Sequence, residues 1–332
     1  MIHLKTPNGF NVQVPENKEE DDTPRFDINL DGAEALKYYN NNGYVIFNNC
    51  ISQNKCEIIR GTWEKNIKPY KGTIYRQTTA KAEKNFFNDN NWIMNPVLNL
   101  QSLNPYLFKD LRNIVENEVF SNNLICRALK CILGEKPKIV QSMYFEGNSA
   151  TWEHQDSYYL DSEKVGEMTA AWLALEEIKA DAGRFFICPE SHKIDHGRQN
   201  INNNIADNHD KYIKEIVSII KSKNMKIKAP YMGAGDVLLW NSWTIHGSIN
   251  SQNTNHSRSS ITIHAIPESH KFLQFHTRKM DLQTEDLGNS TVYRPKDQSK
   301  LMNRLILKIE SNFPTLFYWL KKKVIKFLIG NS

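Results

Sequence analysis

The second half of the chain consists of short runs of apolar and β-branched residues separated by turn residues. From about residue 137 there are eight such runs, each of strand length. They cover residues 138–145, 151–159, 168–178, 183–190, 226–232, 236–241, 244–249 and 258–266. Closely spaced short strands of this kind predict an antiparallel sandwich or barrel. One amphipathic helix, predicted at 206–223, interrupts them.

The first half is predicted to be mainly helical. Residues 31–68 are typical of a helix, a short strand at Tyr44–Phe47 and a second helix with Ser52 as its N-cap. Apolar residues at helical spacing within 85–135 predict further helices that support the core. The acidic, proline-bearing segment within residues 1–30 has no apolar period, so we expect a loose arm there.

Length and composition favour one large domain, which we expect at residues 31–270, followed by an extension at 271–332. The chain has 332 residues, 40% of them hydrophobic, enough for a sizeable core. Its five cysteines are an odd number without a CxxC pair, which favours reduced buried thiols over disulfides or a zinc site. Neither a secretory leader nor an apolar span is evident, so we expect a soluble cytoplasmic protein.

The net charge of +5 belongs to the C-terminal tail. Residues 300–332 hold seven basic side chains against Glu310, which leaves the rest of the chain near neutrality. This distribution argues against a nucleic-acid partner. The segment "FPTLFYWLKKKVIKFLIGNS" predicts a basic amphipathic helix from Pro314. Residues 313–330 are therefore candidates for peripheral contact with an anionic membrane at the inner surface, or for packing on the barrel or on another subunit. The oligomeric state stays open.

A histidine and an aspartate lie two residues apart in "TWEHQDSYYLDS", residues 151–162. Alternation along a strand would direct His154 and Asp156 to the same side. His246, which follows the predicted strand in "GDVLLWNSWTIHGS", could complete a set of two histidines and one carboxylate. Such a set leaves three positions of an octahedral ion open and suits Fe(II) better than structural zinc.

The last predicted strand, "RSSITIHAI", has one wholly polar face formed by Arg258, Ser260, Thr262 and His264. A buried guanidinium without an anion costs several kcal/mol, at least about 3. No acid in this strand offers a partner, so Arg258 favours a carboxylate co-substrate held near the metal. His264 we interpret as an interior histidine with its hydrogen bonds satisfied.

Three blocks in order give this chain its family resemblance. "WEHQD" resembles the His-x-Asp block of the phytanoyl-CoA dioxygenase (PhyH) family of Fe(II)/2-oxoglutarate-dependent oxygenases. "AAWLALEEIKADAGRFFICPESHK" and "GDVLLWNSWTIHGSINSQNTNHSRSSITIH" resemble the two blocks that follow in that family, and "NNGYVIF" resembles its start. The resemblance covers about residues 33–268. It implies a mainly β core within an α+β chain, a double-stranded β-helix of the jelly-roll, cupin-like kind with N-terminal helices and a C-terminal helical tail.

The resemblance also implies roles for individual residues. His154, Asp156 and His246 would be the catalytic iron ligands, with 2-oxoglutarate and O2 as co-substrates. Arg258 would bind the distal carboxylate of 2-oxoglutarate, with the cofactor-binding residues Ser248, Ser260, Trp172 and Gln141 nearby. Two departures concern the substrate: Glu190 replaces a glycine of the family's Pro-Gly-Ser-His turn, and "EGNSA" replaces the "K-P-P-G" stretch before the His-x-Asp block.

The expected activity is hydroxylation of a small organic molecule, a natural-product, glycan or lipid intermediate, with release of succinate and CO2. Since Asp156 is present, halogenation, which in the family accompanies loss of this carboxylate, is disfavoured. Candidate substrate residues are Tyr158, Tyr159, Arg184 and Trp243, although core packing or, for Arg184, an exposed edge explains them equally well. The alternatives are a non-catalytic ligand-binding barrel with a vestigial metal site and a metal-dependent hydrolase.

Overall fold

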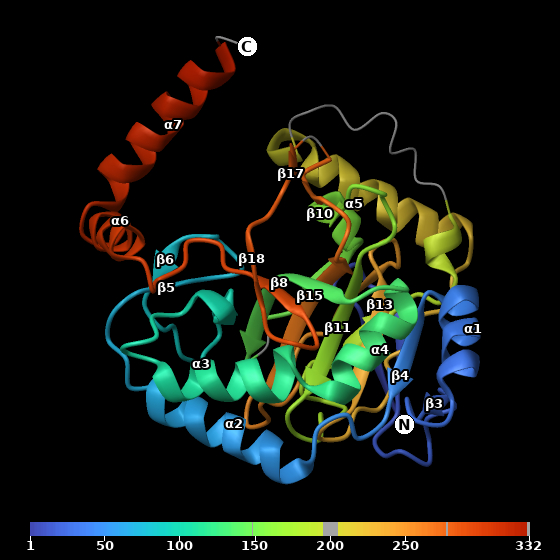
Figure 1. Ribbon diagram of the computed structural model, residues 1–332. Helices are drawn as coiled ribbons and strands as arrows, with labels where there is room; N and C mark the ends of the chain where they lie inside the picture. The colour runs from blue at the N-terminus through green and yellow to red at the C-terminus, as the bar shows by residue number, and fades with distance from the viewer. Residues whose placement is uncertain (148, 195–204, 277, 331–332) are drawn as a thin grey trace.

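A computed structural model describes residues 1–147, 149–194, 205–276 and 278–330 (Figure 1). The chain has a mixed α/β fold built on a large sheet, with strand order β18-β19-β8-β15-β11-β13-β4-β3 and β7 paired beside β8. A smaller sheet has the order β12-β14-β9. The predicted run of short, mostly antiparallel strands in the second half is therefore present.

The helices and strands have the following bounds. The helices are α1 (Gly32–Asn42), α2 (Gln53–Asn66), α3 (Lys109–Val115), α4 (Asn123–Leu133), α5 (Ile205–Ser222), α6 (Leu301–Asn312) and α7 (Pro314–Gly330), with short helical turns at Leu100–Ser102, Glu116–Phe120, Asp156–Tyr158 and Ser191–Lys193. The strands are β1 (Ile2–Lys5), β2 (Asn11–Val14), β3 (Arg25–Phe26), β4 (Tyr44–Phe47), β5 (Ile74–Tyr75), β6 (Ala82–Glu83), β7 (Val97–Leu98), β8 (Pro137–Phe145), β9 (Thr151–His154), β10 (Leu160–Ser162), β11 (Thr169–Ala174), β12 (Phe185–Ile187), β13 (Val237–Asn241), β14 (His246–Ser248), β15 (Ser260–Pro267), β16 (Phe272–Gln274), β17 (Arg278–Met280), β18 (Thr284–Asp286) and β19 (Thr291–Tyr293).

Helices cover the outer face of the large sheet (Figure 1). Side chains of α2, α3 and α4 pack there against alternate residues of β4, β11, β13 and β15 in one apolar cluster. Trp63 of α2 stacks on Tyr144 of β8, with ring centroids 3.7 Å apart. The predicted N-cap is confirmed, because the Ser52 hydroxyl accepts a hydrogen bond from the Lys55 amide at the start of α2.

The inner face of the same strands contacts the smaller sheet. Trp172 of β11 and Trp240 of β13 lie there with Phe185 and Ile187 of β12 in a second apolar cluster. Because residues alternate between faces, one set of strands packs on the helices and encloses a separate interior with its other side. That interior holds the polar residues described below.

The expectation of a loose arm at residues 1–30 is wrong. β1 and β2 form an antiparallel hairpin, and Val12 and Val14 are buried against Phe186 and Ile249. Arg25 binds the carboxylates of Asp21 and Asp236, which ties the acidic segment to the domain. The hairpin strands alternate between more and less buried residues and precede the acidic run, and packing against the smaller sheet stabilises them.

The sheets also continue past residue 270, where we expected the domain to end. β16 pairs with β10, and β19 runs parallel to β8 at the edge of the large sheet. Conversely, the strand predicted at 226–232 is reduced to one isolated pairing of Lys228 with Ile187. Composition alone did not distinguish these edge strands from loops because edge strands are short and partly polar.

Two helices form the end of the chain, the second as predicted from Pro314. α7 projects away from the body in Figure 1. No helix in the described part of the chain is long and apolar enough to cross a membrane. All five cysteines are free, and four of them are buried, as their spacing predicted.

Gly235 turns the chain into β13 and should be the more sensitive of two left-handed glycines. Its φ is +87°, and a Cβ would overlap the carbonyl oxygen of Ile51, whereas Gly134, with φ +76°, has open space around it. We expect Gly134→Ala to lower the free energy of unfolding by about 1–2 kcal/mol, the cost of a left-handed alanine. Gly235→Ala should cost at least about 2 kcal/mol more, because backbone must move. Urea denaturation of both variants measures this, and equal losses would contradict the proposed clash.

Candidate metal centre

Three side chains converge between the two sheets. His154 ends β9, His246 begins β14, and the two residues are direct partners in the antiparallel pairing of these strands. The Oδ1 atom of Asp156 lies 3.7 Å from Nε2 of His154 and 3.5 Å from Nε2 of His246. One ligand atom from each of the three residues lies within 4.8 Å of the others, a geometry that could hold a metal ion. The sequence therefore identified the cluster correctly.

The local backbone differs from the continuous strand expected through residue 159. β9 ends at His154, Gln155 is still extended, and Asp156 starts a single helical turn. Alternation through Gln155 thus directs the two side chains to the same side, as expected, although no strand follows. The Gln155 amide donates to the Tyr212 hydroxyl of α5, and the Ser157 amide donates to the Ser242 carbonyl. Both neighbours of Asp156 are therefore fixed.

Backbone carbonyls orient the two imidazole rings. Nδ1 of His154 lies 2.8 Å from the Trp152 carbonyl oxygen, and Nδ1 of His246 lies 2.9 Å from that of Thr244. Because a carbonyl only accepts hydrogen bonds, Nδ1 carries the proton in each ring and Nε2 presents its lone pair to the cluster. This is the tautomer that a metal ligand requires.

Electrostatics keep the cluster ready for a cation. Burial, together with the nearby His246, lowers the pKa of His154 to about 4, so its ring is neutral at physiological pH. Burial by itself would raise the pKa of Asp156, but the imidazoles of His246 and His264 reverse this effect and hold it well below the usual range. A neutral imidazole at His154 and an ionised carboxylate at Asp156 suit a mononuclear transition-metal site with open positions.

Two further residues contact Asp156 that the sequence did not identify as part of the site. The indole Nε1 of Trp240 donates a 2.8 Å hydrogen bond to Oδ2, and Nε2 of His264 lies 3.3 Å from the same oxygen. The expectation that His264 is an interior histidine is confirmed, but its hydrogen bonds are not satisfied, because neither ring nitrogen has a hydrogen-bond partner among the described residues. The position of His264 on the same polar face as Arg258 could have indicated that it belongs to the site. For Trp240 the sequence offered only an expected buried position.

Arg258 is buried and has no acidic partner among the described residues. Its Nη1 donates to the Gly183 carbonyl at 3.1 Å, its guanidinium lies over the Phe145 ring, and its Nε has no hydrogen-bond partner. Burial lowers its pKa to about 9, so the side chain still carries its charge at pH 7. A buried cation in this state fits an anionic group that enters from outside the chain.

The other predicted cofactor-binding residues occupy the same interior with different immediate contacts. The Ser260 hydroxyl donates to the Arg258 carbonyl, and the Ser248 hydroxyl accepts from the Thr151 amide. Trp172 stacks on Phe185, which in turn stacks on His246, so it reaches the cluster indirectly. Gln141, half-buried on β8, is the register partner of His264 on β15.

The four candidate substrate residues separate into different environments. Tyr159 lies edge-on to the His154 ring at 6.0 Å, and its hydroxyl contacts His209 of α5. Tyr158 instead stacks on Tyr212 with centroids 3.7 Å apart, so it packs α5. Half-buried Trp243 lies against Gly166.

Arg184 does not lie at the cluster. It donates to the carbonyls of Pro15 and Ile178, and it shares the outer face of β12 with Phe186, opposite Phe185. The expectation that it contacts substrate is therefore wrong. Neighbouring residues of a strand point to opposite faces, so Phe185 faces the interior and Arg184 the outside. The guanidinium of Arg184 therefore lies against the N-terminal segment.

The fold and the site together define a class of proteins. Its members bind one metal ion between β strands through ligands that occupy one side of the ion and leave the other side open. A family model of phytanoyl-CoA dioxygenase (PhyH) matches residues 39–260, and the chain belongs to this family, as its motifs predicted.

Comparisons with individual proteins agree with this assignment. A phytanoyl-CoA dioxygenase domain-containing protein 1 homolog of Caenorhabditis elegans is 25% identical over 153 residues, 44% of this chain and 52% of that protein. This chain thus spans about half the length of that curated relative.

Solved structures show the shared fold. The non-heme alpha ketoglutarate dependent carbocyclase SnoK from nogalamycin biosynthesis superimposes with a TM-score of 0.58 at 15% identity, covering 80% of this chain and 98% of SnoK. EctD from S. alaskensis, solved with 2-oxoglutarate and 5-hydroxyectoine, gives 0.52 at 14% identity over 86% and 96%. The epimerase SnoN, solved with Fe3+, alpha ketoglutarate and nogalamycin RO, gives 0.51 at 13% identity over 80% and 96%.

Removal of one ligand should abolish tight metal binding without unfolding the protein. We expect His154→Ala to weaken Co(II) binding on the order of 100-fold, since two donors from one face hold an open site poorly. His3→Ala, at an exposed position of β1, is the matched control and should bind as the wild type does. Equilibrium dialysis with metal analysis measures both. Equal binding by His154→Ala and wild type would place the metal elsewhere.

Proposed function

We propose that this protein is a Fe(II)- and 2-oxoglutarate-dependent dioxygenase with a double-stranded β-helix core, and that it hydroxylates a small organic molecule. One observation carries the proposal. A face of two histidines and one carboxylate shares a buried interior with Arg258, a cation that has no acidic partner among the described residues. Family membership and the fold of the solved relatives support it.

The residues fit both groups that this chemistry needs. His154, Asp156 and His246 would hold iron, and the guanidinium of Arg258 would pair with the distal carboxylate of 2-oxoglutarate. When bound, iron and 2-oxoglutarate supply oxidation by O2 with release of succinate and CO2. The presence of all three candidate ligands together with Arg258 disfavours a vestigial site, and dependence on 2-oxoglutarate distinguishes the oxygenase from a zinc-dependent hydrolase.

The chain's own contribution is to orient these groups and to exclude water. Backbone carbonyls orient both imidazoles, and Trp172 and Phe185 form an apolar stack that ends on the His246 ring. Tyr159, edge-on to His154, is the substrate residue that we retain. Its neighbours Tyr158 and Trp243 would act through packing. SnoK is a carbocyclase and SnoN an epimerase, so similar folds catalyse different reactions. Hydroxylation by this protein would depend on which hydrogen of the substrate Tyr159 and its surroundings place near the metal.

Loss of Arg258 should weaken 2-oxoglutarate binding while metal binding remains. Wild-type protein with Fe(II) and 2-oxoglutarate under anaerobic conditions should develop a weak visible charge-transfer band. We expect Arg258→Leu to raise the concentration of 2-oxoglutarate at half-saturation about 10- to 100-fold, since a charge-assisted pair contributes about 1.5–3 kcal/mol. Absence of the band in wild type would overturn the oxygenase assignment.

Arg184→Leu is the matched control, because it removes another fully buried arginine. It should lower the melting temperature by loosening the N-terminal segment, whose Pro15 carbonyl it binds. The 2-oxoglutarate titration of the folded variant should be unchanged. A similar loss of affinity in both variants would assign the effect to general destabilisation.

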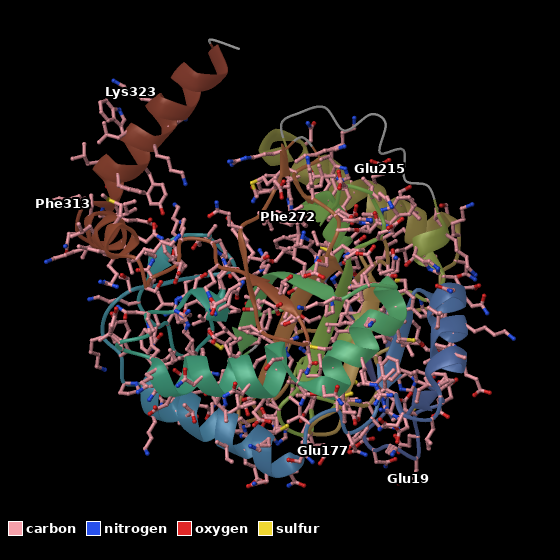
Figure 2. The ribbon with its side chains drawn as sticks, viewed as in Figure 1. Glu19, Glu177, Glu215, Phe272, Phe313 and Lys323 are labelled. Carbon is pink, nitrogen blue, oxygen red and sulfur yellow. The ribbon has the colours of Figure 1, made fainter. Side chains whose placement is uncertain are left out.

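We further infer that the C-terminal helices rest on an anionic membrane surface, through residues 313–330 and the adjoining face of α6. Large apolar side chains are exposed along both helices: Leu301, Met302, Leu305, Ile309, Phe313, Leu316, Trp319 and Leu320. Figure 2 shows Phe313 and Lys323 on the part that extends from the body. Lys321, Lys322 and Lys323 are exposed beside them.

Charge complementarity favours an anionic bilayer as the occupant of this surface. The nearby acid, Glu310, is buried and accepts hydrogen bonds from Tyr75 and Tyr318, so it does not oppose the lysines. Exposed apolar residues with adjacent lysines are the pattern of helices that lie in a membrane interface.

The membrane surface can be tested by flotation with vesicles. Full-length protein should float with vesicles that contain phosphatidylglycerol and stay in solution with phosphatidylcholine alone. Replacement of Lys321, Lys322 and Lys323 by glutamine should reduce flotation several-fold, at about 1 kcal/mol for each lysine. Flotation that is independent of lipid charge, or self-association by sedimentation with no flotation, would overturn the proposal.

A further inference from the structure

The two oxygens of Asp156 have different surroundings. Oδ1 faces His154 and His246, whereas Oδ2 lies 2.8 Å from Nε1 of Trp240 and 3.3 Å from Nε2 of His264. Neither ring nitrogen of His264 makes a hydrogen bond in the described part of the chain, so the approach of Nε2 to Oδ2 is an electrostatic contact. The cluster of candidate ligands includes Asp156 but not His264.

The register of the large sheet explains how two residues from different strands reach one oxygen. His264 on β15 pairs directly with Ala170 on β11, and Ala170 pairs directly with Trp240 on β13. Directly paired residues point to the same face, so the imidazole and the indole flank Ala170 in one row. Their backbones are two strands, about 9.6 Å, apart.

The small side chain of Ala170 leaves room for both rings. The ring centroids of Trp240 and His264 lie 6.5 Å apart, well below the strand separation, so the rings lean toward each other above the alanine methyl group. Both polar nitrogens then meet at Asp156. A larger residue in the middle of this row would separate the rings from the carboxylate.

We propose that Trp240 and His264 are positioning residues that hold Oδ2 of Asp156 and restrict this carboxylate to one-oxygen coordination. The inference rests on the proposed function and deepens it. Two histidines with one carboxylate oxygen leave three positions of an octahedral ion open. A carboxylate that chelated through both oxygens would leave two, which the keto and carboxylate oxygens of 2-oxoglutarate would fill. The contacts of Trp240 and His264 with Oδ2 would therefore favour coordination through Oδ1 alone and leave room for O2.

One strand thus serves both ends of the site. Arg258, just before β15, is directed at the co-substrate carboxylate in the proposed function, and His264, six residues further on, steadies the metal ligand. Outer-shell partners of ligating carboxylates typically change metal affinity or activity about 10- to 100-fold when removed. Trp240 and His264 should lie within this range.

The test uses Trp240→Phe, which removes the donor and keeps an aromatic ring, and His264→Leu, each alone and together. Each single variant should weaken Co(II) binding about 10-fold, and the pair more strongly. Nitric oxide, added under anaerobic conditions to the Fe(II)–2-oxoglutarate complex as a probe for the third position, should give a reduced electron paramagnetic resonance signal in the double variant. His264→Gln, which keeps an N–H donor, should recover part of the loss.

The outcomes separate this inference from the proposed function. His256→Leu, a surface histidine paired with Asp181, is the matched control and should leave both readouts unchanged. If wild type binds neither metal nor 2-oxoglutarate, the proposed function fails. Suppose instead that wild type binds both. If all the folded variants at Trp240 and His264 then match wild type in metal affinity and nitric oxide signal and differ only in thermal stability, the positioning role is overturned.

Discussion

An ionised carboxylate held between two β sheets is the group on which the site depends. Asp156 is buried, and burial alone would favour its neutral form. Three imidazoles and one indole N–H surround it instead, and the helical turn that carries it is fixed by hydrogen bonds on both sides. The surroundings of Asp156 stabilise negative charge and present one oxygen to a cation, which is what a metal ligand on an open face must do.

The interior therefore contains one buried anion, Asp156, and one buried cation, Arg258, with different partners. Asp156 accepts a hydrogen bond from the Trp240 indole and lies among three imidazoles, whereas the Arg258 guanidinium has a backbone carbonyl and an aromatic ring but no acid among the described residues. Arg184 is equally buried, and its Nε, like that of Arg258, has no hydrogen-bond partner, but both of its terminal nitrogens donate to carbonyls on the outer face. The two arginines therefore differ in the face they occupy and in the number of carbonyl partners, and Arg258 is the one on the polar face of the last strand.

Much of the site could be predicted because its pattern is local. His154 and Asp156 lie two apart, His246 ends a turn after a buried strand, and Arg258 interrupts an apolar strand with a charge. The structure brings the first three together in a group that could hold a metal and buries Arg258, while their roles stay predictions. The predictions failed where two residues of the same type have different roles because they contact different parts of the fold. Tyr158 packs against α5, whereas Tyr159 faces His154. The start of the chain forms a hairpin because its valines pack against Phe186 and Ile249.

The sequence by itself determined the family, the strand-rich second half and the set of candidate ligands, because periodicity and motif spacing are properties of neighbouring residues. Tertiary structure alone decided which oxygen of Asp156 is free and which is held. That depends on the register of three strands, in which Ala170 separates His264 from Trp240. Register is a relation between segments about 70 and 95 residues apart, and it arises only when the sheet closes around its core.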